Sequence, residues 1–315
     1  MRIGILSYYF GHISGEEQQR HALKNALMKL DHVNSVDIIS AERKEKKYRP
    51  IDFPGKNNLQ LSETNLDSYD LLILFSYWEK LKTRTFVINY IVNLPLTLRD
   101  INYLRSHDTI INELPNANMH LSNSKTLVDK LNELGLNAKY STIFYDENNF
   151  YKIDNIAKTD EVVYVGSNLP FKGNRLERYI DILCNYNLSI YGWGWSEKKY
   201  MKFYKGILEY ADLRLVYNRA KIVFGYTADF QRDYGMVNNR VFEVLACNGT
   251  LVTDDIPWIT NNLNENCSIY TDTNELINLV ENETFSTKCL TNSELIKYNS
   301  LTKGIEILKY YDSFH

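Results

Sequence analysis

The stretch MVNNRVFEVLACNGTLVTDD, residues 236–255, contains a helix and a strand joined by one tight turn. Its polar start leads into the apolar run Val241–Ala246. We expect this run to be a helix that ends near Asn248-Gly249, because glycine is preferred just past a helix end. Thr250–Thr253 (TLVT) is then predicted to be a strand. A helix that passes directly into a strand is the repeating unit of α/β proteins, so this stretch places the chain in that fold class.

The same alternation extends upstream of this stretch. Strands are predicted at 161–165 (EVVYV), 188–191 and 220–226, and a helix at 175–184. Turns follow the first two strands, at Gly166-Ser167-Asn168 and at Gly192-Trp193-Gly194. The second half of the chain is therefore predicted to form one complete α/β unit.

The first half repeats the pattern. Its predicted elements are a strand at 2–8, a glycine-containing loop at 11–15, a helix at 16–30, strands at 36–39 and 71–75 (LLILF), and a helix at 124–134. Strand, loop, helix and strand in this order make a parallel βαβ unit, whose crossover helices cover the faces of the sheet.

The domain organisation follows from a polar, Asn- and Asp-rich segment at 145–159. We interpret this segment as a connection, and we predict two facing Rossmann-like domains with parallel sheets and a cleft between them, at 1–155 and 156–297. A chain of 315 residues fits two domains of ordinary size. The final helical stretch is long enough to cross back, so residues 298–315 are predicted to pack on the first domain.

Composition excludes several classes of protein. The net charge of −3 argues against a general polyanion binder, although a local basic groove is compatible with it. The four cysteines (Cys184, Cys247, Cys267 and Cys289) have no metal-ligand spacing and are expected to be free thiols. No stretch approaches the roughly 18 apolar residues of a membrane span, and no signal peptide is recognised. We therefore expect a cytoplasmic protein.

Three loops of the second half are predicted to lie beyond the carboxyl ends of its strands, where α/β sheets bind ligands. The first contains Gly166 and Ser167, followed by Lys172 and Arg175. Glycine lets the backbone approach a phosphate closely, and the cations supply charge, so this loop is suited to a diphosphate. A turn that carries two solvated cations is the alternative.

The second and third loops give further candidates. Gly192 and Gly194 lie between bulky rings, which indicates either a ligand close to the backbone or a turn with packed indoles. In the third loop, Asn239 precedes Arg240 and Glu243, which are three residues apart and therefore share a helix face. A carboxylate can accept both hydroxyls of a ribose while an arginine binds diphosphate oxygens. The alternative is an exposed pair that contributes little to stability.

These segments resemble one glycosyltransferase family in order and spacing. The helix NRVFEVLAC at 239–247, the following strand, and the upstream pieces VYVGS, IYGWGW and LVYNRAKIVFGY are similar to the spore-maturation (CgeB-type) group of glycosyltransferases. The resemblance covers roughly residues 160–260. It implies the GT-B fold and a nucleotide-sugar donor, with a UDP-sugar favoured.

A looser resemblance is to phage DNA glucosyltransferases, which are also GT-B enzymes. They have a Gly-Ser loop followed by two basic residues, like Lys172 and Arg175, and an R-x-x-E helix, like Arg240 and Glu243. The resemblance implies that the basic residues hold the diphosphate and the glutamate holds the ribose. The catalytic aspartate of that family, shortly before a Leu-Pro pair, has no counterpart before Leu94-Pro95.

The predicted function is glycosyl transfer to an unidentified acceptor, which would be a protein, a glycan or a small molecule. No metal or cofactor is expected besides the nucleotide-sugar, and Asp254-Asp255 is expected to cap or face solvent. Gly235 stands where many retaining enzymes have a first glutamate, so the stereochemical outcome is open. A general base is expected from Glu16 or Glu17, with His12 and Asp100 as further candidates.

Three alternatives remain at this stage. The enzyme alternatives are a phage-type DNA base glycosyltransferase, which needs a basic binding surface, and a nucleotide-sugar epimerase, which needs no acceptor. The non-enzyme alternative is a two-domain small-ligand binding protein.

Overall fold

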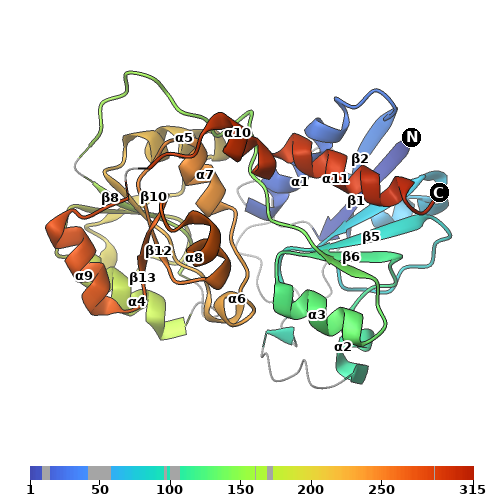
Figure 1. Ribbon diagram of the computed structural model, residues 1–315, viewed down its shortest axis with the longest axis horizontal. Helices are drawn as coiled ribbons and strands as arrows, with labels where there is room; N and C mark the ends of the chain where they lie inside the picture. The colour runs from blue at the N-terminus through green and yellow to red at the C-terminus, as the bar shows by residue number, and fades with distance from the viewer. Residues whose placement is uncertain are drawn as a thin grey trace. The chain divides into compact units, whose positions relative to one another are not determined.

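The structure is a computed structural model of the chain. It describes residues 1–8, 15–41, 58–95, 98–99, 107–159, 161–168, 173–286 and 288–315. The chain forms two compact units, Met1–Phe144 together with Tyr298–His315, and Tyr145–Lys297 (Figure 1). Each unit is described below by itself.

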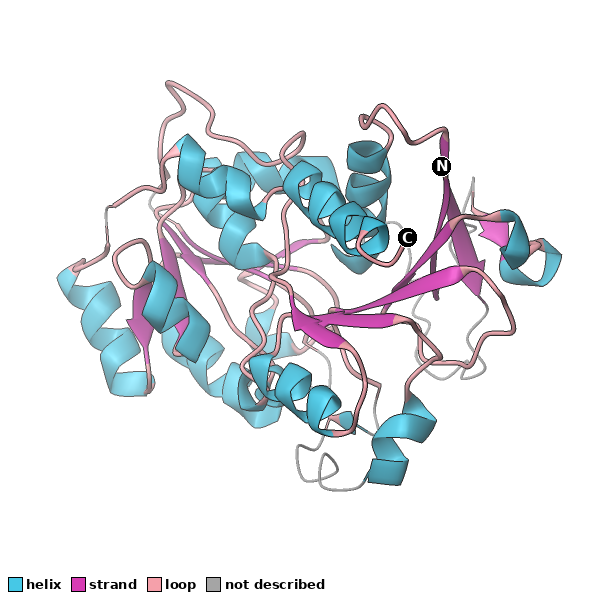
Figure 2. Cartoon of the chain, turned by 45° about the vertical axis from the view of Figure 1, so that its right-hand side comes forward, coloured by secondary structure: helices cyan, strands magenta, loops and turns pink. Residues whose placement is uncertain are grey.

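The first unit contains a sheet in the order β3-β2-β1-β4-β5-β6-β7, and all neighbouring strands are parallel (Figure 2). Its strands are β1 (Arg2–Tyr8), β2 (Ser35–Ala41), β3 (Leu59–Gln60), β4 (Leu71–Phe75), β5 (Phe86–Ile91), β6 (Met119–Ser122) and β7 (Ala138–Tyr140). Every residue of β4 is buried, as predicted for an apolar strand that is covered on both faces. The strands β5 and β6 were not predicted from the sequence.

The helices of this unit are α1 (Gly15–Leu27), α2 (His107–Glu113), α3 (Lys125–Glu133) and α11 (Ser300–Asp312). Helix α1 buries Ala22, Leu23, Ala26 and Leu27, which confirms the predicted apolar face. Helix α3 begins at its N-cap Ser124, whose hydroxyl accepts a hydrogen bond from the backbone of Leu127 at 3.1 Å.

Helix α11 returns to the first unit and packs against α1. Gly304 permits this approach, because a Cβ there would lie 3.3 Å from Leu27 Cδ2. The buried ammonium of Lys303 donates to Ser141 Oγ and to Glu306 Oε2, each at 2.6 Å. Burial lowers the pKa of Lys303, although the Glu306 carboxylate favours its charged form. The hydrogen bond from this buried ammonium to Ser141 holds α11 to the first unit.

The second unit contains a parallel sheet in the order β10-β9-β8-β11-β12-β13. Its strands are β8 (Val162–Val165), β9 (Leu188–Tyr191), β10 (Tyr204–Gly206), β11 (Ile222–Phe224), β12 (Leu251–Asp254) and β13 (Ser268–Tyr270). In both sheets the first strand lies in the middle, and the chain changes direction beside it, between β1 and β4 and between β8 and β11. This is the Rossmann strand order, in which ligands bind beside that reversal.

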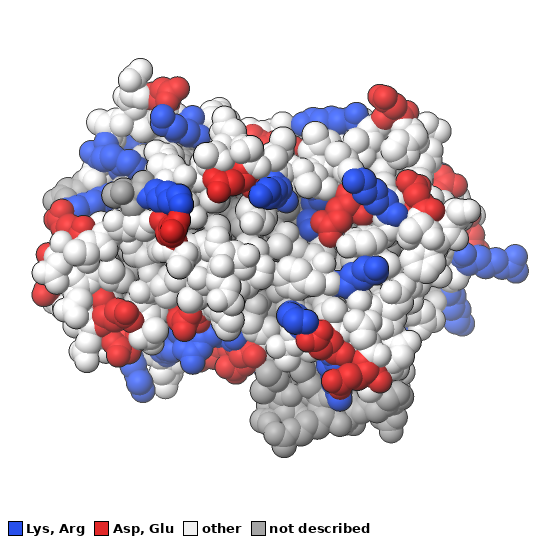
Figure 3. All heavy atoms as spheres, viewed as in Figure 1, with Lys and Arg blue, Asp and Glu red and all other residues white. Residues whose placement is uncertain are grey.

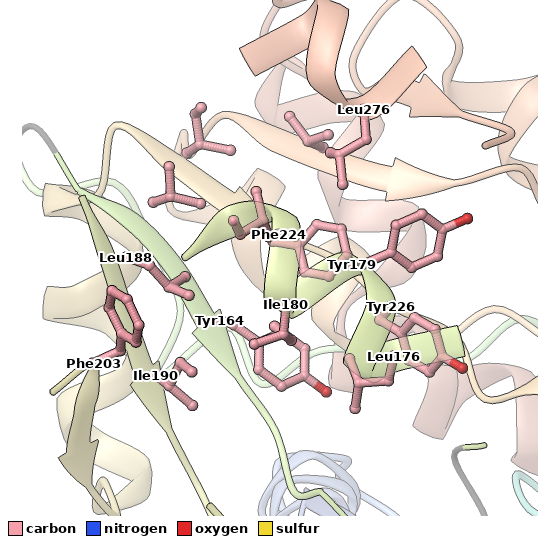
Figure 4. Close-up of a cluster of buried hydrophobic side chains, with 14 of the residues drawn as sticks. Tyr164, Leu176, Tyr179, Ile180, Leu188, Ile190, Phe203, Phe224, Tyr226 and Leu276 are labelled. Atoms are coloured by element: carbon pink, nitrogen blue, oxygen red, sulfur yellow. The ribbon is translucent and has the colours of Figure 1, made fainter. Parts of the chain in front are cut away.

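The helices of the second unit cover both faces of its sheet. They are α4 (Gly173–Leu183), α5 (Tyr210–Arg219), α6 (Asp229–Asp233), α7 (Arg240–Ala246), α8 (Pro257–Leu263), α9 (Thr273–Asn282) and α10 (Asn292–Leu295). Figure 4 shows the core between α4 and the sheet, where Leu176 and Ile180 pack among the rings of Tyr164, Tyr179 and Phe224. None of the helices in the described part of the chain is long and apolar enough to span a membrane.

Candidate functional site

The candidate site lies at the carboxyl ends of the strands of the second unit, where β8 and β11 meet. Its parts are the loop 166–168 after β8, the loop 192–195 after β9, the loop 225–228 after β11, and the segment 238–243 that enters α7. The predicted donor residues Gly166, Ser167, Gly192, Gly194, Asn239, Arg240 and Glu243 all lie on these segments, and Arg175 reaches them from α4. Lys172 lies outside the described residues.

Gly192 and Gly194 are required by contact between two loops. Gly166 N donates to Tyr191 O at 2.8 Å and Asn168 N donates to Trp193 O at 2.7 Å. A Cβ on Gly192 would lie 2.4 Å from Gly166 O, and a Cβ on Gly194 would lie 2.3 Å from Asn168 O. Both glycines also have positive φ, at 128° and 82°. The close backbone neighbour is therefore the adjacent loop of the protein itself.

The same two loops are joined by an indole. Trp195 is buried, and its Nε1 donates to Gly166 O at 2.7 Å. The backbone N–H groups of Gly166 and Asn168 are thus used inside the protein, and Ser167 stays partly exposed between them. Packed indoles were the alternative interpretation of this motif, and Trp195 has that arrangement.

The guanidinium of Arg175 is held by the protein. Its Nε donates to Asp229 Oδ1 at 2.7 Å, and its terminal nitrogens donate to Thr227 O at 2.6 Å and to Asp254 Oδ2 at 3.3 and 3.4 Å. Burial lowers the pKa of Arg175, but the two carboxylates outweigh burial and raise it further above its usual value. Arg175 therefore ties α4 to the loops that follow β11 and β12.

Asp254 is the buried counter-ion of this arginine. Its carboxylate accepts hydrogen bonds from Thr227 N at 3.2 Å and from Thr227 Oγ1 at 2.9 Å. Burial raises its pKa, although Arg175 and Thr227 favour the charged form. Asp255 is exposed and accepts from Thr260 Oγ1. No group of three or more metal-ligating side chains occurs among the described residues.

Arg240 points toward two tyrosine rings. Its guanidinium carbon lies 5.6 Å from the centre of the Tyr164 ring, and Tyr217 lies close enough to stabilise its charge. Burial lowers its pKa, but Tyr217 and Tyr164 outweigh burial and raise it. The residue is partly exposed, and its Nε is buried without a hydrogen-bond partner.

Glu243 is a desolvated carboxyl group on the same helix. Its side chain is 3% exposed, and Oε1 accepts a hydrogen bond from the side chain of Asn239. Burial raises its pKa to about 7, although Asn239 and Arg240 favour the charged form. A carboxylate that is already stripped of water can accept hydrogen bonds from two hydroxyls of a ligand without further desolvation.

Buried polar atoms without a hydrogen-bond partner lie at the start of α7 and on the neighbouring helix α5. They are Asn238 Oδ1 and Arg240 Nε at the start of α7, and Tyr210 Oη and Arg214 Nε on α5, which packs against α7. Tyr210 lies close to Glu243, whose charge raises its already burial-elevated pKa. Because buried polar groups in native proteins are nearly always hydrogen-bonded, such a group of atoms points to a bound ligand or ordered water.

Two of these residues were missed in the sequence. Tyr210 and Thr227 carry no motif, since their roles arise from contacts between segments distant in the chain. Asp254 was expected to cap a helix or to face solvent, and this was wrong: it is buried and paired with Arg175.

The two glutamates of the first unit have different surroundings. Glu17 is buried, forms an ion pair with Arg20, and accepts a hydrogen bond from Asn58 at 3.2 Å. Burial raises its pKa, but the hydrogen bond with His21 and the charge of Arg20 outweigh burial and lower it. Glu16 is partly exposed, and its Oε1 accepts from Asn93 Nδ2 at 2.7 Å. His12 and Asp100 lie outside the described residues.

Comparisons with known proteins give one family match and a set of similar solved structures. A family model described as Glycosyl transferase-like matches residues 175–289, which lie within the second unit. No characterised protein matches the sequence significantly. The family match supports a glycosyltransferase.

Several solved structures are similar to this chain in fold. HepE of Anabaena, in complex with UDP and glucose, superposes with a TM-score of 0.62 at 13% identity over 99% of this chain and 100% of that one. AviGT4, a glycosyltransferase involved in avilamycin A biosynthesis, gives 0.59 at 12% identity over 99% and 97%. An alpha-glucosyltransferase in complex with UDP and a 13-mer DNA gives 0.56 at 12% identity over 80% and 79%. The fold of the two parallel-sheet units is therefore GT-B, as predicted.

Proposed function

We propose that the chain is a glycosyltransferase that takes a sugar from a nucleoside diphosphate sugar, with a UDP-sugar favoured. The observation that carries this proposal is the buried Glu243 carboxyl group with Arg240 and Tyr210 close to it, each of which has a buried atom without a hydrogen-bond partner, at the ligand-binding edge of a Rossmann sheet. The UDP-containing complexes of HepE and of the alpha-glucosyltransferase support the choice of nucleotide.

The roles of the donor residues follow from their surroundings. The Glu243 carboxylate is proposed to accept the two ribose hydroxyls, and Arg240, whose Nε has no partner, to face the diphosphate together with Ser167 and Lys172. Arg175 is proposed to contribute mainly by holding the loops in place, because its donors are engaged by Asp229 and Asp254.

In the proposed reaction, the bond between the anomeric carbon and the diphosphate oxygen breaks, and a bond to the acceptor oxygen forms. The charge that develops on the diphosphate is stabilised by preorganised donors, each contributing about 3 kcal/mol. The acceptor proton passes to a base, for which we propose Glu16 in preference to Glu17 if the reaction inverts. No metal is needed in this scheme, and the donor is consumed as a co-substrate.

A panel of nucleotide-sugars tests this function without knowledge of the acceptor. We expect slow release of free sugar and UDP from at least one UDP-sugar, and a loss of about 100-fold or more in the Glu243→Ala variant. The exposed Glu281→Ala variant is the control and should match the wild type. Conversion of the sugar to its epimer, without net hydrolysis, would identify an epimerase instead.

The acceptor is proposed to be a protein, a glycan or a small molecule. On the face shown in Figure 3, basic and acidic side chains of the described residues are interspersed, so this face offers no continuous basic surface for DNA. A DNA duplex nevertheless belongs in the acceptor panel, since the alpha-glucosyltransferase with this fold was solved with DNA.

A further inference from the structure

The side-chain amide of Asn238 donates a hydrogen bond through its nitrogen, whereas its oxygen accepts none. Asn238 precedes α7, and its Nδ2 donates to Thr227 Oγ1 at 3.3 Å. Its Oδ1 is buried and has no hydrogen-bond partner, although the residue as a whole is partly exposed. A buried carbonyl oxygen left in this state destabilises the unliganded protein, so it needs a hydrogen-bond donor from a ligand or from ordered water that a ligand can displace.

The orientation of this amide is fixed by the hydrogen-bond chemistry of Thr227. A threonine hydroxyl has a single proton, and that proton is donated to Asp254 Oδ1 at 2.9 Å. Thr227 Oγ1 can therefore only accept from Asn238, which places Nδ2 toward Thr227 and Oδ1 away from it. The reversed amide would bring two acceptors together.

The anchor itself is rigid. Asp254 accepts from the backbone N–H of Thr227 at 3.2 Å, and Arg175 donates both to Asp254 and to Thr227 O. The backbone N–H and C=O of Thr227 are thus both held by charged side chains, Asp254 and Arg175. The Asn238 oxygen is consequently an oriented acceptor whose position costs a ligand no reorganisation.

We infer that Asn238 is a specificity-determining residue, whose Oδ1 accepts a hydrogen bond from one hydroxyl of the transferred sugar. This inference rests on the proposed function. A lone acceptor repels phosphate oxygens, and the ribose hydroxyls are assigned to Glu243, so the donors of a UDP-sugar that remain are the sugar hydroxyls and uracil N3–H, which the Kd for UDP distinguishes. The favoured substrates are hydroxylated sugars, and the deoxy sugar that lacks this hydroxyl is rejected.

The experiment compares the UDP-sugar that the wild type hydrolyses best with its monodeoxy analogues. We expect wild-type kcat/KM to fall about 10- to 100-fold for one analogue, since a buried acceptor left unpaired discriminates strongly. In Asn238→Ala, the ratio of kcat/KM for the parent UDP-sugar to kcat/KM for that analogue should approach one. The Kd of this variant for UDP should stay within about twofold of the wild-type value. Asn238→Leu, which keeps the volume, should behave like the alanine variant.

The control is Asn262→Ala, because Asn262 is an exposed asparagine of the same unit whose Nδ2 donates to Trp258 O at 2.8 Å. It should retain wild-type discrimination. Undiminished discrimination in both Asn238 variants would overturn the inference, and so would a weaker Kd for UDP, which assigns Asn238 to the nucleotide. A wild type that binds no UDP would overturn the proposed function as well, so the two failures are distinguishable.

Discussion

Glu16 and Glu17 are neighbours in the chain whose environments fit them for different tasks. Glu17 points inward to the fully buried Arg20, whose terminal nitrogen donates to its carboxylate and whose charge it compensates. Glu16 reaches Asn93 at the carboxyl end of β5. Asn93 Oδ1 accepts from Leu94 N at 2.9 Å, so its Nδ2 is directed at Glu16. A partly exposed carboxylate that is oriented by an amide is the better candidate for proton transfer.

Substitution separates these roles. Glu17→Gln should reduce the free energy of unfolding by about 3 kcal/mol, because it leaves the Arg20 charge buried and unpaired. Glu16→Gln should leave stability nearly unchanged and reduce turnover by about 100-fold or more if the reaction inverts. Urea unfolding and donor turnover of both variants provide the measurements. A stable, inactive Glu17→Gln variant would reverse the assignment.

The lowered pKa of Glu17 also predicts a pH dependence. A carboxyl group with a folded-state pKa below its unfolded value of 4.5 stabilises the fold above pH 4.5, and this contribution disappears as the pH falls through the folded-state value. Wild-type stability should therefore decrease more steeply than that of Glu17→Gln between pH 5 and the acid range. Parallel slopes would show that the ion pair contributes nothing.

At the scale of elements, the loops after β8 and β9 pack against each other, and Gly194 is required at this contact for two reasons. Gly194 has a φ of 82°, and a Cβ added to it would clash with the carbonyl oxygen of Asn168. Gly206 has a φ of 101°, but a Cβ there meets nothing within 4 Å. The second glycine therefore isolates the effect of backbone strain.

Gly206→Ala should destabilise the protein by about 1–2 kcal/mol through φ strain alone. Gly194→Ala should cost about 1–3 kcal/mol more, since the two loops must separate. It should also weaken UDP binding, because the loop after β8 borders the candidate site. Thermal unfolding and calorimetry of the two variants make the comparison. Equal effects of both substitutions would contradict a role for the loop contact.

The elements also show what could be predicted from the sequence. Apolar runs and glycine turns predicted β1, β4, β8, β9 and β12, because burial on both faces leaves an unbroken apolar signal. Strand β5 was missed since FVINYI carries Asn89, a buried side chain that bonds His120 across the sheet at 3.2 Å. A polar residue paired only in the tertiary structure is indistinguishable in the sequence from a loop residue.

The site was predictable to a similar extent. The positions of Arg240 and Glu243 on one helix followed from their spacing, whereas the engagement of Arg175 by Asp229 and Asp254 depends on segments 54 and 79 residues away. Gly192 and Gly194 were recognised as close-approach positions, but their neighbour is another loop. Sequence patterns thus predict which helix or loop carries a functional side chain. Only the packing of helices and loops shows which of these side chains are free to bind a ligand.

At the scale of the whole molecule, the chain builds the same strand order twice, and its last helix returns to the first unit. This duplicated Rossmann architecture is the GT-B fold, which the Anabaena HepE structure shares along the full length of both chains. In the second unit, the buried Glu243 lies close to Arg240 and Tyr210, each of which has a buried atom without a hydrogen-bond partner. Nucleotide recognition is therefore proposed for the second unit.

Calorimetric titration of the complete chain with UDP tests this claim most directly. We predict saturable binding to the wild type with one UDP per chain, and at least a 10-fold increase in Kd for Glu243→Ala at an unchanged unfolding temperature. Because the pKa of Glu243 is about 7, the wild-type affinity should rise with pH from 6 to 8, as the carboxylate form becomes populated. Absence of UDP binding, or an identical Kd in the Glu243→Ala variant, would contradict the account.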